Sequence, residues 1–357
     1  MNIVIEEIFG KVKNVADAVS VTAQNSLRQA LNVSPRAQAI VREVVDLTGN
    51  CAKKLYRRTV GTLQQATTSL TRIFAHPSEE FRHKKSFPER PVVGISDMFK
   101  RWNEEYVNFI RNQCMKRFED CEGESITPIE DEDGVFIARS EYAPDITVDQ
   151  AKRFGFILPE DVDERVNRNP SLRVRPLMIR CFGVGSGNTV DQIKAGVKNI
   201  LSLSTSKVLR ANTLIQSHIK SEQQRFESDE NTLVIPFITG FSMGGMFANA
   251  IAIKNNYTSM VFNGLGLGEK NCKLVGKENW KKAQQQPAGH VAIVVDHDFV
   301  ASQDAPWRKV TRTPGQIVSI PSDIPNSIER MHEIHFYNKA FNKVHEQHFA
   351  SLRQDHT

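Results

Sequence analysis

The sequence has few cysteines and no paired cysteine motif. Its five cysteines are scattered over 357 residues, and no C-x-x-C pair occurs among Cys51, Cys114, Cys121, Cys181 and Cys272. An odd number of widely spaced cysteines neither builds a disulfide framework nor supplies the paired ligands of a structural zinc site. We therefore expect reduced thiols that act as small apolar side chains.

Long apolar runs and the pattern of a standard secretory signal are also missing. No stretch approaches the roughly 18 consecutive apolar residues that a membrane-spanning helix needs. The N-terminus, Met-Asn-Ile-Val-Ile-Glu-Glu, lacks a basic segment followed by a long apolar core, so it does not predict a standard secretory signal. The sequence thus predicts a protein that is cytoplasmic or exported without such a signal.

A strong excess of one charge is missing as well. The chain has 46 Lys and Arg against 41 Asp and Glu, a formal net charge of +5. This balance is too weak to indicate a nucleic-acid partner. A hydrophobic content of 40% and a charged content of 24% are ordinary for a globular protein.

What the chain does have is a glycine-flanked serine between two apolar runs. Residues 233–238 form a short run of strand type, residues 246–253 are small, apolar and helix-compatible, and Gly-Phe-Ser-Met-Gly-Gly stands between them at 240–245. A G-x-S-x-G pattern between a strand and a helix is typical of a nucleophile elbow, a sharp turn that exposes a serine hydroxyl. The alternative is a glycine-rich turn with a buried capping serine.

The residue types around Ser242 suit this chemistry. A side chain at Gly240 or Gly244 would crowd the turn, and Gly245 allows the helix to pack closely. The N-terminus of the following helix offers N–H groups and a positive dipole end to a developing oxyanion. The N–H of Met243 is the expected first donor.

Residues 239–248 carry a family resemblance. They read Thr-Gly-Phe-Ser-Met-Gly-Gly-Met-Phe-Ala, which resembles the T-G-H-S-L-G-G-A-x-A signature of α/β-hydrolases of the class 3 lipase type. Phe241 departs from this signature, because the family usually has His there. The resemblance covers roughly residues 172–345. It implies a lipase-like or esterase-like serine hydrolase that takes an ester or lipid small molecule as its substrate.

A second glycine-rich loop follows a predicted strand at 177–182. It reads Gly-Val-Gly-Ser-Gly-Asn at 183–188, lacks the third glycine of G-x-G-x-x-G and is not a Walker A loop. We therefore expect no nucleotide cofactor here. In α/β-hydrolases the loop after an early strand supplies the second oxyanion N–H, which makes Gly183 or Val184 the candidate donor. A plain strand-to-helix turn is the alternative.

A serine nucleophile needs a histidine base and a carboxylate that orients it. In α/β-hydrolases the carboxylate follows the serine in the chain, and the histidine comes last. Asp296 and Asp298 both follow a predicted strand at 290–295. Because Asp298-Phe299-Val300 resembles the D-x-V segment of class 3 lipases, Asp298 is the predicted acid and Asp296 the alternative.

The candidate bases follow the last predicted strand, at 316–320. The spacing of His332, Ile334 and Tyr337 resembles the histidine segment of lipase-like relatives, so His332 is the predicted base and His335 the alternative. Without matched acidic or cysteine ligands, the C-terminal histidines do not predict a metal site. The later ones are expected to be solvated: His345, His348 and His356.

The whole chain divides into five predicted segments. They are a helical N-terminal region at 1–75, a proline-rich linker at 76–93, a helical and mixed accessory segment at 94–171, an α/β-hydrolase-like domain at 172–345 and a C-terminal tail at 346–357. Strands that alternate with helices predict a mostly parallel sheet with flanking helices in the α/β-hydrolase-like domain. Within the accessory segment, Thr147-x-x-Gln150 predicts a capping box, and 158–171 is expected to be a charged loop.

The N-terminal region supplies a second class of function. Its basic residues include Lys53, Lys54, Arg57 and Arg58. They predict an arm that docks on a membrane surface or on an acidic protein partner. The alternative is a solvated helix face. The alternative function is thus a non-catalytic binding or scaffolding protein on a hydrolase-like fold. A third possible function is acyl transfer to an acceptor other than water, which would use the same serine, histidine and aspartate.

Overall fold

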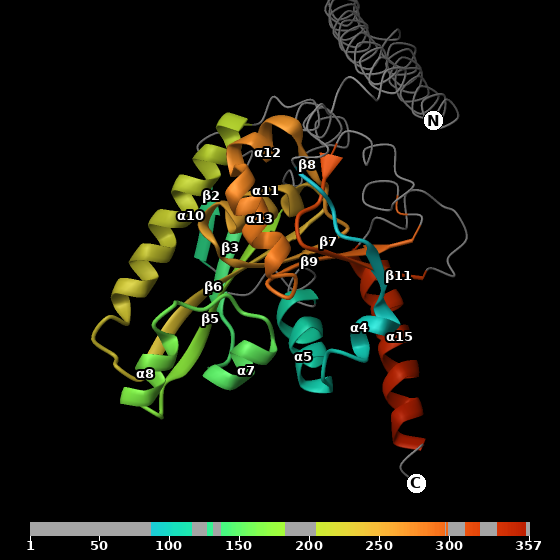
Figure 1. Cartoon of the computed structure of the whole chain (residues 1–357), viewed down its shortest axis with the longest axis horizontal. Helices are drawn as coiled ribbons and strands as arrows, with labels where there is room; N and C mark the ends of the chain where they lie inside the picture. The colour runs from blue at the N-terminus through green and yellow to red at the C-terminus, as the bar shows by residue number, and fades with distance from the viewer. Residues whose placement is uncertain are drawn as a thin grey trace, which may run out of the picture. The chain divides into compact units, whose positions relative to one another are not determined.

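A mostly parallel sheet with helices on both faces forms the core of the protein (Figure 1). The computed structural model describes residues 87–115, 127–130, 137–182, 205–296, 298, 311–321 and 334–354. Within these ranges the strand order is β1-β11-β9-β7-β6-β5-β3-β2, and a short β4 pairs with the start of β5. The predicted α/β class is confirmed. The helical region predicted at 1–75 lies outside the described residues.

Neighbouring strands from β5 across to β1 are parallel, so their carboxyl ends share one edge of the sheet. These strands are β5 (Arg173–Phe182), β6 (Thr232–Phe241), β7 (Thr258–Phe262), β9 (His290–Val295), β11 (Gln316–Ile320) and β1 (Val92–Gly94). Antiparallel pairing adds β3 (Ile137–Tyr142), β4 (Ile146–Thr147) and β2 (Thr127–Glu130). A separate pair is formed by β8 (Leu267–Gly268) and β10 (Thr311–Arg312).

Alternation along the strands creates two apolar layers. On β6, Ile235 and Phe237 belong to one buried cluster, whereas Val234 and Ile238 belong to the other. One layer is covered by α10 (Thr205–Arg225), α11 (Met243–Asn255), α12 (Glu269–Val275) and α13 (Lys277–Gln285). The other is covered by α4 (Ile95–Phe99), α5 (Glu104–Phe109), the π-helix η2 (Ile110–Met115), α7 (Val148–Arg153), α8 (Val162–Arg168) and α15 (Ile334–Gln354).

The described end of the predicted linker is part of the fold. Phe87 is buried and meets the ring of Trp280 edge-on, with 5.3 Å between ring centroids. The indole N–H of Trp280 donates to the carbonyl of Pro88 at 2.8 Å. A few residues on, β1 pairs with β11. The prolines suggested a linker, but Phe87 is buried in an apolar layer and β1, which follows the last proline, joins the sheet.

The boundary predicted at residue 172 does not separate two cores. Strand β3 pairs with β5 over its whole length, so Ser140 lies opposite Ile179. Helix α8 occupies part of the stretch expected to be a charged loop at 158–171, and Val162 buries its apolar side. The accessory segment therefore shares the sheet and one apolar layer with the later strands.

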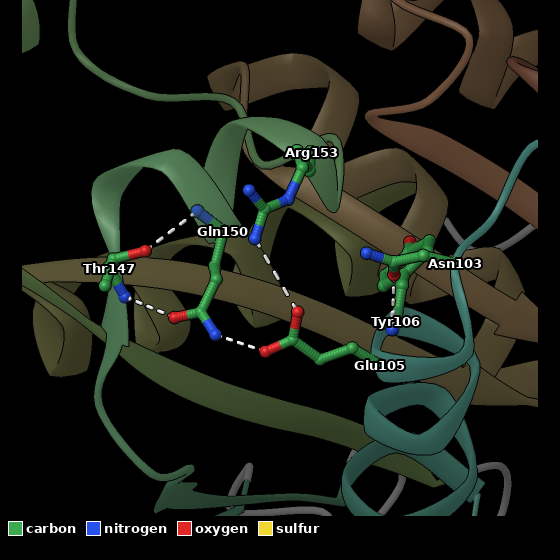
Figure 2. Close-up of polar contacts among 6 residues, drawn as sticks. All are labelled: Asn103, Glu105, Tyr106, Thr147, Gln150 and Arg153. Atoms are coloured by element: carbon green, nitrogen blue, oxygen red, sulfur yellow. Dashed lines mark hydrogen bonds and ion pairs between the residues drawn. The ribbon is translucent and has the colours of Figure 1, made fainter.

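The capping box predicted at the start of α7 is confirmed (Figure 2). The hydroxyl of Thr147 accepts from the N–H of Gln150 at 3.0 Å, and the side-chain oxygen of Gln150 accepts from the N–H of Thr147 at 2.7 Å. The amide nitrogen of Gln150 also donates to Glu105, which lies 3.6 Å from the guanidinium of Arg153. These contacts join α7 to α5.

The C-terminal segment differs from its prediction. Helix α15 runs to Gln354, so much of the expected tail at 346–357 is helical. His345, expected to be solvated, is buried, and its ring centroid lies 5.0 Å from that of Phe349 and 6.3 Å from that of Phe99. The physical reason is helical spacing, because Phe341, His345 and Phe349 lie four residues apart on the face that packs against α4.

The described cysteines behave as apolar side chains. Cys114, Cys181 and Cys272 are free and buried. Burial raises the pKa of all three thiols, that of Cys114 to about 12. Reactive thiolate is thus suppressed at these positions, as the sequence predicted for structural thiols.

Candidate active site

Ser242 is the single residue between β6 and α11. Its backbone has φ 55° and ψ −126°, a conformation that side-chain-bearing residues rarely adopt. Its N–H donates to the carbonyl of Phe262 at 3.2 Å, and its carbonyl accepts from Gly245 and Leu265 at 3.1 and 3.0 Å. Strain of this kind persists only where neighbouring groups impose it, and it concentrates at functional sites.

The flanking glycines are required by space. A Cβ on Gly240 would lie 2.4 Å from the carbonyl oxygen of Gly244, and one on Gly244 would lie 2.0 Å from the carbonyl oxygen of Cys181. A Cβ on Gly245 would lie 2.6 Å from the Cα of Gly264. The end of β5, the end of β6 and the start of α11 therefore meet without room for side chains, which forces the sharp turn at Ser242.

The side chain of Ser242 does not cap the helix. An N-cap serine normally accepts a hydrogen bond from an N–H in the first helical turn, and Ser242 makes no such bond. The residue is partly exposed, unlike the fully packed residues of α11 that follow it. These observations disfavour the capping alternative. The hydroxyl lies at the N-terminus of α11, which is the positive end of the helix dipole.

The predicted oxyanion donors lie on two segments. Met243 is the first residue of α11, and the first N–H groups of a helix have no intrahelical acceptor. Strand β5 pairs with β6 up to the Cys181–Gly240 level and ends at Phe182. The other candidate donors, Gly183 and Val184, follow directly and lie outside the described residues.

The turn after β9 holds the two candidate acids in different surroundings. Asp298 is fully buried, and its N–H donates to the carbonyl of Val295 at 3.2 Å. Asp296 is partly exposed, its N–H donates to Ile320 at 2.9 Å, and its carboxylate accepts from the hydroxyl of Ser319. Because Ser319 belongs to β11, Asp296 is held on the side of β9 that faces away from the elbow strand.

The candidate bases fall beyond the described part of the site. Strand β11 ends at Ile320 on the same edge as Ser242, and α15 begins at Ile334. His332 lies between these elements, outside the described residues, and so does the side chain of His335. The chain therefore leaves β11, the last strand before His332, at the edge of the sheet where Ser242 lies.

Asn263 is a polar residue of this edge that the sequence analysis passed over. It follows β7 directly, is fully buried and has a φ of 42°. Its side-chain oxygen accepts from the N–H of Val295 at 2.8 Å. The feature of the sequence that marks this position is an Asn between an apolar strand and Gly264, because Asn tolerates a positive φ better than most residues. The same pattern is equally typical of an ordinary turn, so it does not identify a residue of the site.

Comparison with known proteins adds no family name. No protein-family model matches the chain, and no curated protein sequence matches it either. Among the residues that the structure describes, no group of three or more His, Cys, Asp or Glu side chains is arranged to hold a metal ion. The geometry of the described site therefore carries the functional argument.

Proposed function

We propose that the protein is a serine hydrolase that cleaves carboxylic esters through an acyl-enzyme. The observation that carries this proposal is the strained Ser242, alone between β6 and α11 and flanked by glycines that cannot accept a Cβ. This is the geometry that a nucleophile elbow requires. The α/β fold supports the same function, because its parallel strands bring the turn of Asp298 and the end of β11, the last strand before His332 in the chain, to the edge where Ser242 lies.

Each residue takes one role in the proposed reaction. The Ser242 oxygen attacks the ester carbonyl while His332 accepts the serine proton. The N–H of Met243, with that of Gly183 or Val184, stabilises the oxyanion. His332 then protonates the leaving alcohol, and the acyl group stays on Ser242 until water, activated by the same histidine, releases the acid. Asp298 orients the imidazole and stabilises its cation.

The substrate class follows from the chemistry of the site and from the family resemblance. We propose an ester or lipid small molecule as the substrate, and a membrane surface or a protein as the partner of the basic N-terminal region at 1–75, which the sequence predicts to be helical. In the described part of the chain, no helix is both long and apolar enough to span a membrane.

Trapping the acyl-enzyme tests the proposal. Short and long p-nitrophenyl esters are mixed with the full chain, and intact mass spectrometry looks for an acyl adduct that Ser242→Ala eliminates. Asp298→Asn should slow ester turnover on the order of 10³- to 10⁴-fold, by analogy with removal of a triad carboxylate. Its matched control, Asp296→Asn, should stay within a few-fold of the wild type. A larger loss in Asp296→Asn would reassign the acid.

A further inference from the structure

The two apolar layers of the fold are covered by helices of very different charge. The helices α10, α11, α12 and α13 together carry ten Lys and Arg against three Asp and Glu. The helices over the other layer, α4, α5, η2, α7, α8 and α15, carry eight against seven. The excess of seven positive charges over the first layer is larger than the net charge of +5 of the whole chain. The positive charge is therefore concentrated on one side of the described fold.

Most of these charges lie on one outer surface. Helix α11 is almost fully buried, so the surface is formed by α10, α12 and α13, and α12 contacts both of the others (Figure 1). We call it the basic face. The acids of α12 and α13 are Glu269, which pairs with Lys273 at 2.7 Å, and Glu278. The exposed lysines of these two helices are Lys270, Lys273, Lys277, Lys281 and Lys282.

An apolar side chain is exposed on the basic face. Leu209 of α10 is 42% exposed, and it is the only exposed large hydrophobic residue in the part of the chain that the structure describes. It stands between Lys207 and Arg210 in the chain. A lone exposed leucine is ordinary, but a leucine among basic residues is the combination that binds a helix to an anionic lipid surface. A nucleic-acid partner would use the charge and not the leucine.

The basic face reaches the edge of the sheet that carries the elbow. On α10, His218 contacts Ser140, and one turn later Glu222 contacts Tyr142, farther along β3. Because β3 runs away from that edge, α10 does so too, and Leu209 lies at the end of α10 nearest the edge. Helix α12 also begins near the edge, because the segment before it bonds to the carbonyl of the elbow serine.

We propose that the basic face docks on an anionic membrane surface, with Leu209 entering the lipid interface and the lysines of α12 and α13 facing the headgroups. Docking would hold the elbow near the lipid, which suits the ester substrate of the proposed function. Only this benefit rests on the proposed function, because docking itself needs no catalysis. The basic face is separate in sequence from the region at 1–75.

The test compares two double variants of the full chain that have the same net charge. Lys270→Glu with Lys277→Glu reverses two charges of the basic face in the first turns of α12 and α13, where an acidic residue suits the helix dipole. The matched control, Lys339→Glu with Lys343→Glu, reverses two exposed lysines of α15, which covers the opposite layer. Both variants keep residues 1–75, so a difference between them reports on the basic face alone.

The readout is co-sedimentation with vesicles of phosphatidylcholine, alone or with about 30% phosphatidylserine. The wild type should bind the anionic vesicles at least about tenfold more tightly than the neutral ones, and added salt should weaken this binding. The double variant of the basic face should lose about tenfold or more in affinity, since each cation near the surface contributes. The α15 control should stay within about twofold of the wild type. Leu209→Ser should weaken the binding severalfold without a change in charge.

Equal binding by the two double variants, or equal binding of the wild type to neutral and anionic vesicles, would overturn the proposal. A Leu209→Ser variant that binds like the wild type would also overturn it, and competition by a short DNA duplex would then assign the face to nucleic acid. If the double variant of the basic face does not fold, Lys281→Gln with Lys282→Gln replaces it and must weaken binding too. A wild type that binds anionic vesicles but hydrolyses no ester would contradict the proposed function alone.

Discussion

At the scale of single residues, the elbow is built by contacts that leave no room for side chains. Ser242 takes the unusual backbone angles, whereas Gly240 and Gly244 are needed because main-chain carbonyls approach within 2.0–2.4 Å of where a Cβ would be. The spacing of these residues is local in the chain, so the sequence alone predicted their arrangement.

A methyl group at position 244 should therefore displace the elbow. We expect Gly244→Ala to lower the free energy of unfolding by about 2 kcal/mol or more, because its Cβ would meet the backbone of Cys181. Gly94→Ala is the control, since its Cβ would have no neighbour within 4 Å and its φ is −66°. Urea unfolding measures both variants, and equal stabilities would contradict the packing described at the elbow.

His290 should make the fold sensitive to acid. Burial lowers its pKa from a usual value near 6.5 to about 4, and its ring lies 3.0 Å from the hydroxyl of Ser259. Because the folded state favours the neutral ring, the stabilisation is complete above pH 6.5 and is lost as the pH falls towards 4. The difference between these two pKa values corresponds to about 3 kcal/mol in the free energy of unfolding.

The measurement is the free energy of unfolding against pH. Between pH 7 and 4 the wild type should lose about 3 kcal/mol more than His290→Gln, whose side chain stays neutral throughout. Parallel curves for the two proteins would show that the ring of His290 does not resist protonation in the folded state.

Two single residues show where sequence reasoning ends. His345 was expected to be solvated because its segment is polar, yet helical spacing places it between Phe99 and Phe349. Asn263 was not singled out, although its side-chain oxygen accepts from the N–H of Val295. In both cases a partner, Phe99 or Val295, comes from a segment far away in the chain, so only the fold reveals the contact.

At the scale of elements, the capping box fixes the residue at which α7 begins. Thr147 and Gln150 satisfy each other's backbone N–H groups, and Gln150 and Arg153 both contact Glu105 near the start of α5 (Figure 2). The ion pair of Arg153 and Glu105 is exposed, so we assign the stabilisation mainly to the cap.

Removing the cap should have a measurable cost. Thr147→Ala is expected to lower the free energy of unfolding by about 1 kcal/mol. Thr213→Ala, in the middle of α10, is the control: its hydroxyl only bonds back to the carbonyl of Leu209, and alanine has the higher helix propensity. Chemical unfolding that finds Thr147→Ala as stable as the wild type would contradict the role of the cap.

Elements with strong local signals were predicted and those without were not. The apolar runs of β6, β7, β9 and β11 and the capping box of α7 are visible in the sequence. Strand β1 was missed because it is short and two prolines precede it closely, and α8 because its residues are mostly charged. Each is stabilised by tertiary pairing or by a single buried side chain, which local patterns do not report.

At the scale of the whole molecule, one edge of the sheet carries the described parts of the candidate site. The parallel strands place the turn of Ser242 after β6, the turn of Asp298 after β9 and the end of β11 at one edge (Figure 1). The sequence predicted the order of these groups and the parallel sheet. The antiparallel strands β3 and β4 extend the same sheet into the segment that was expected to be accessory.

The proposed function requires Ser242 to be an activated nucleophile. The most direct measurement is labelling of the folded full chain with a fluorophosphonate probe, beside Ser242→Ala and His332→Ala. We expect the wild type to be labelled, Ser242→Ala not to be labelled, and His332→Ala to be labelled far more slowly. A folded wild type that stays unlabelled, or a Ser242→Ala variant that labels equally well, would contradict it and favour a binding protein on this fold.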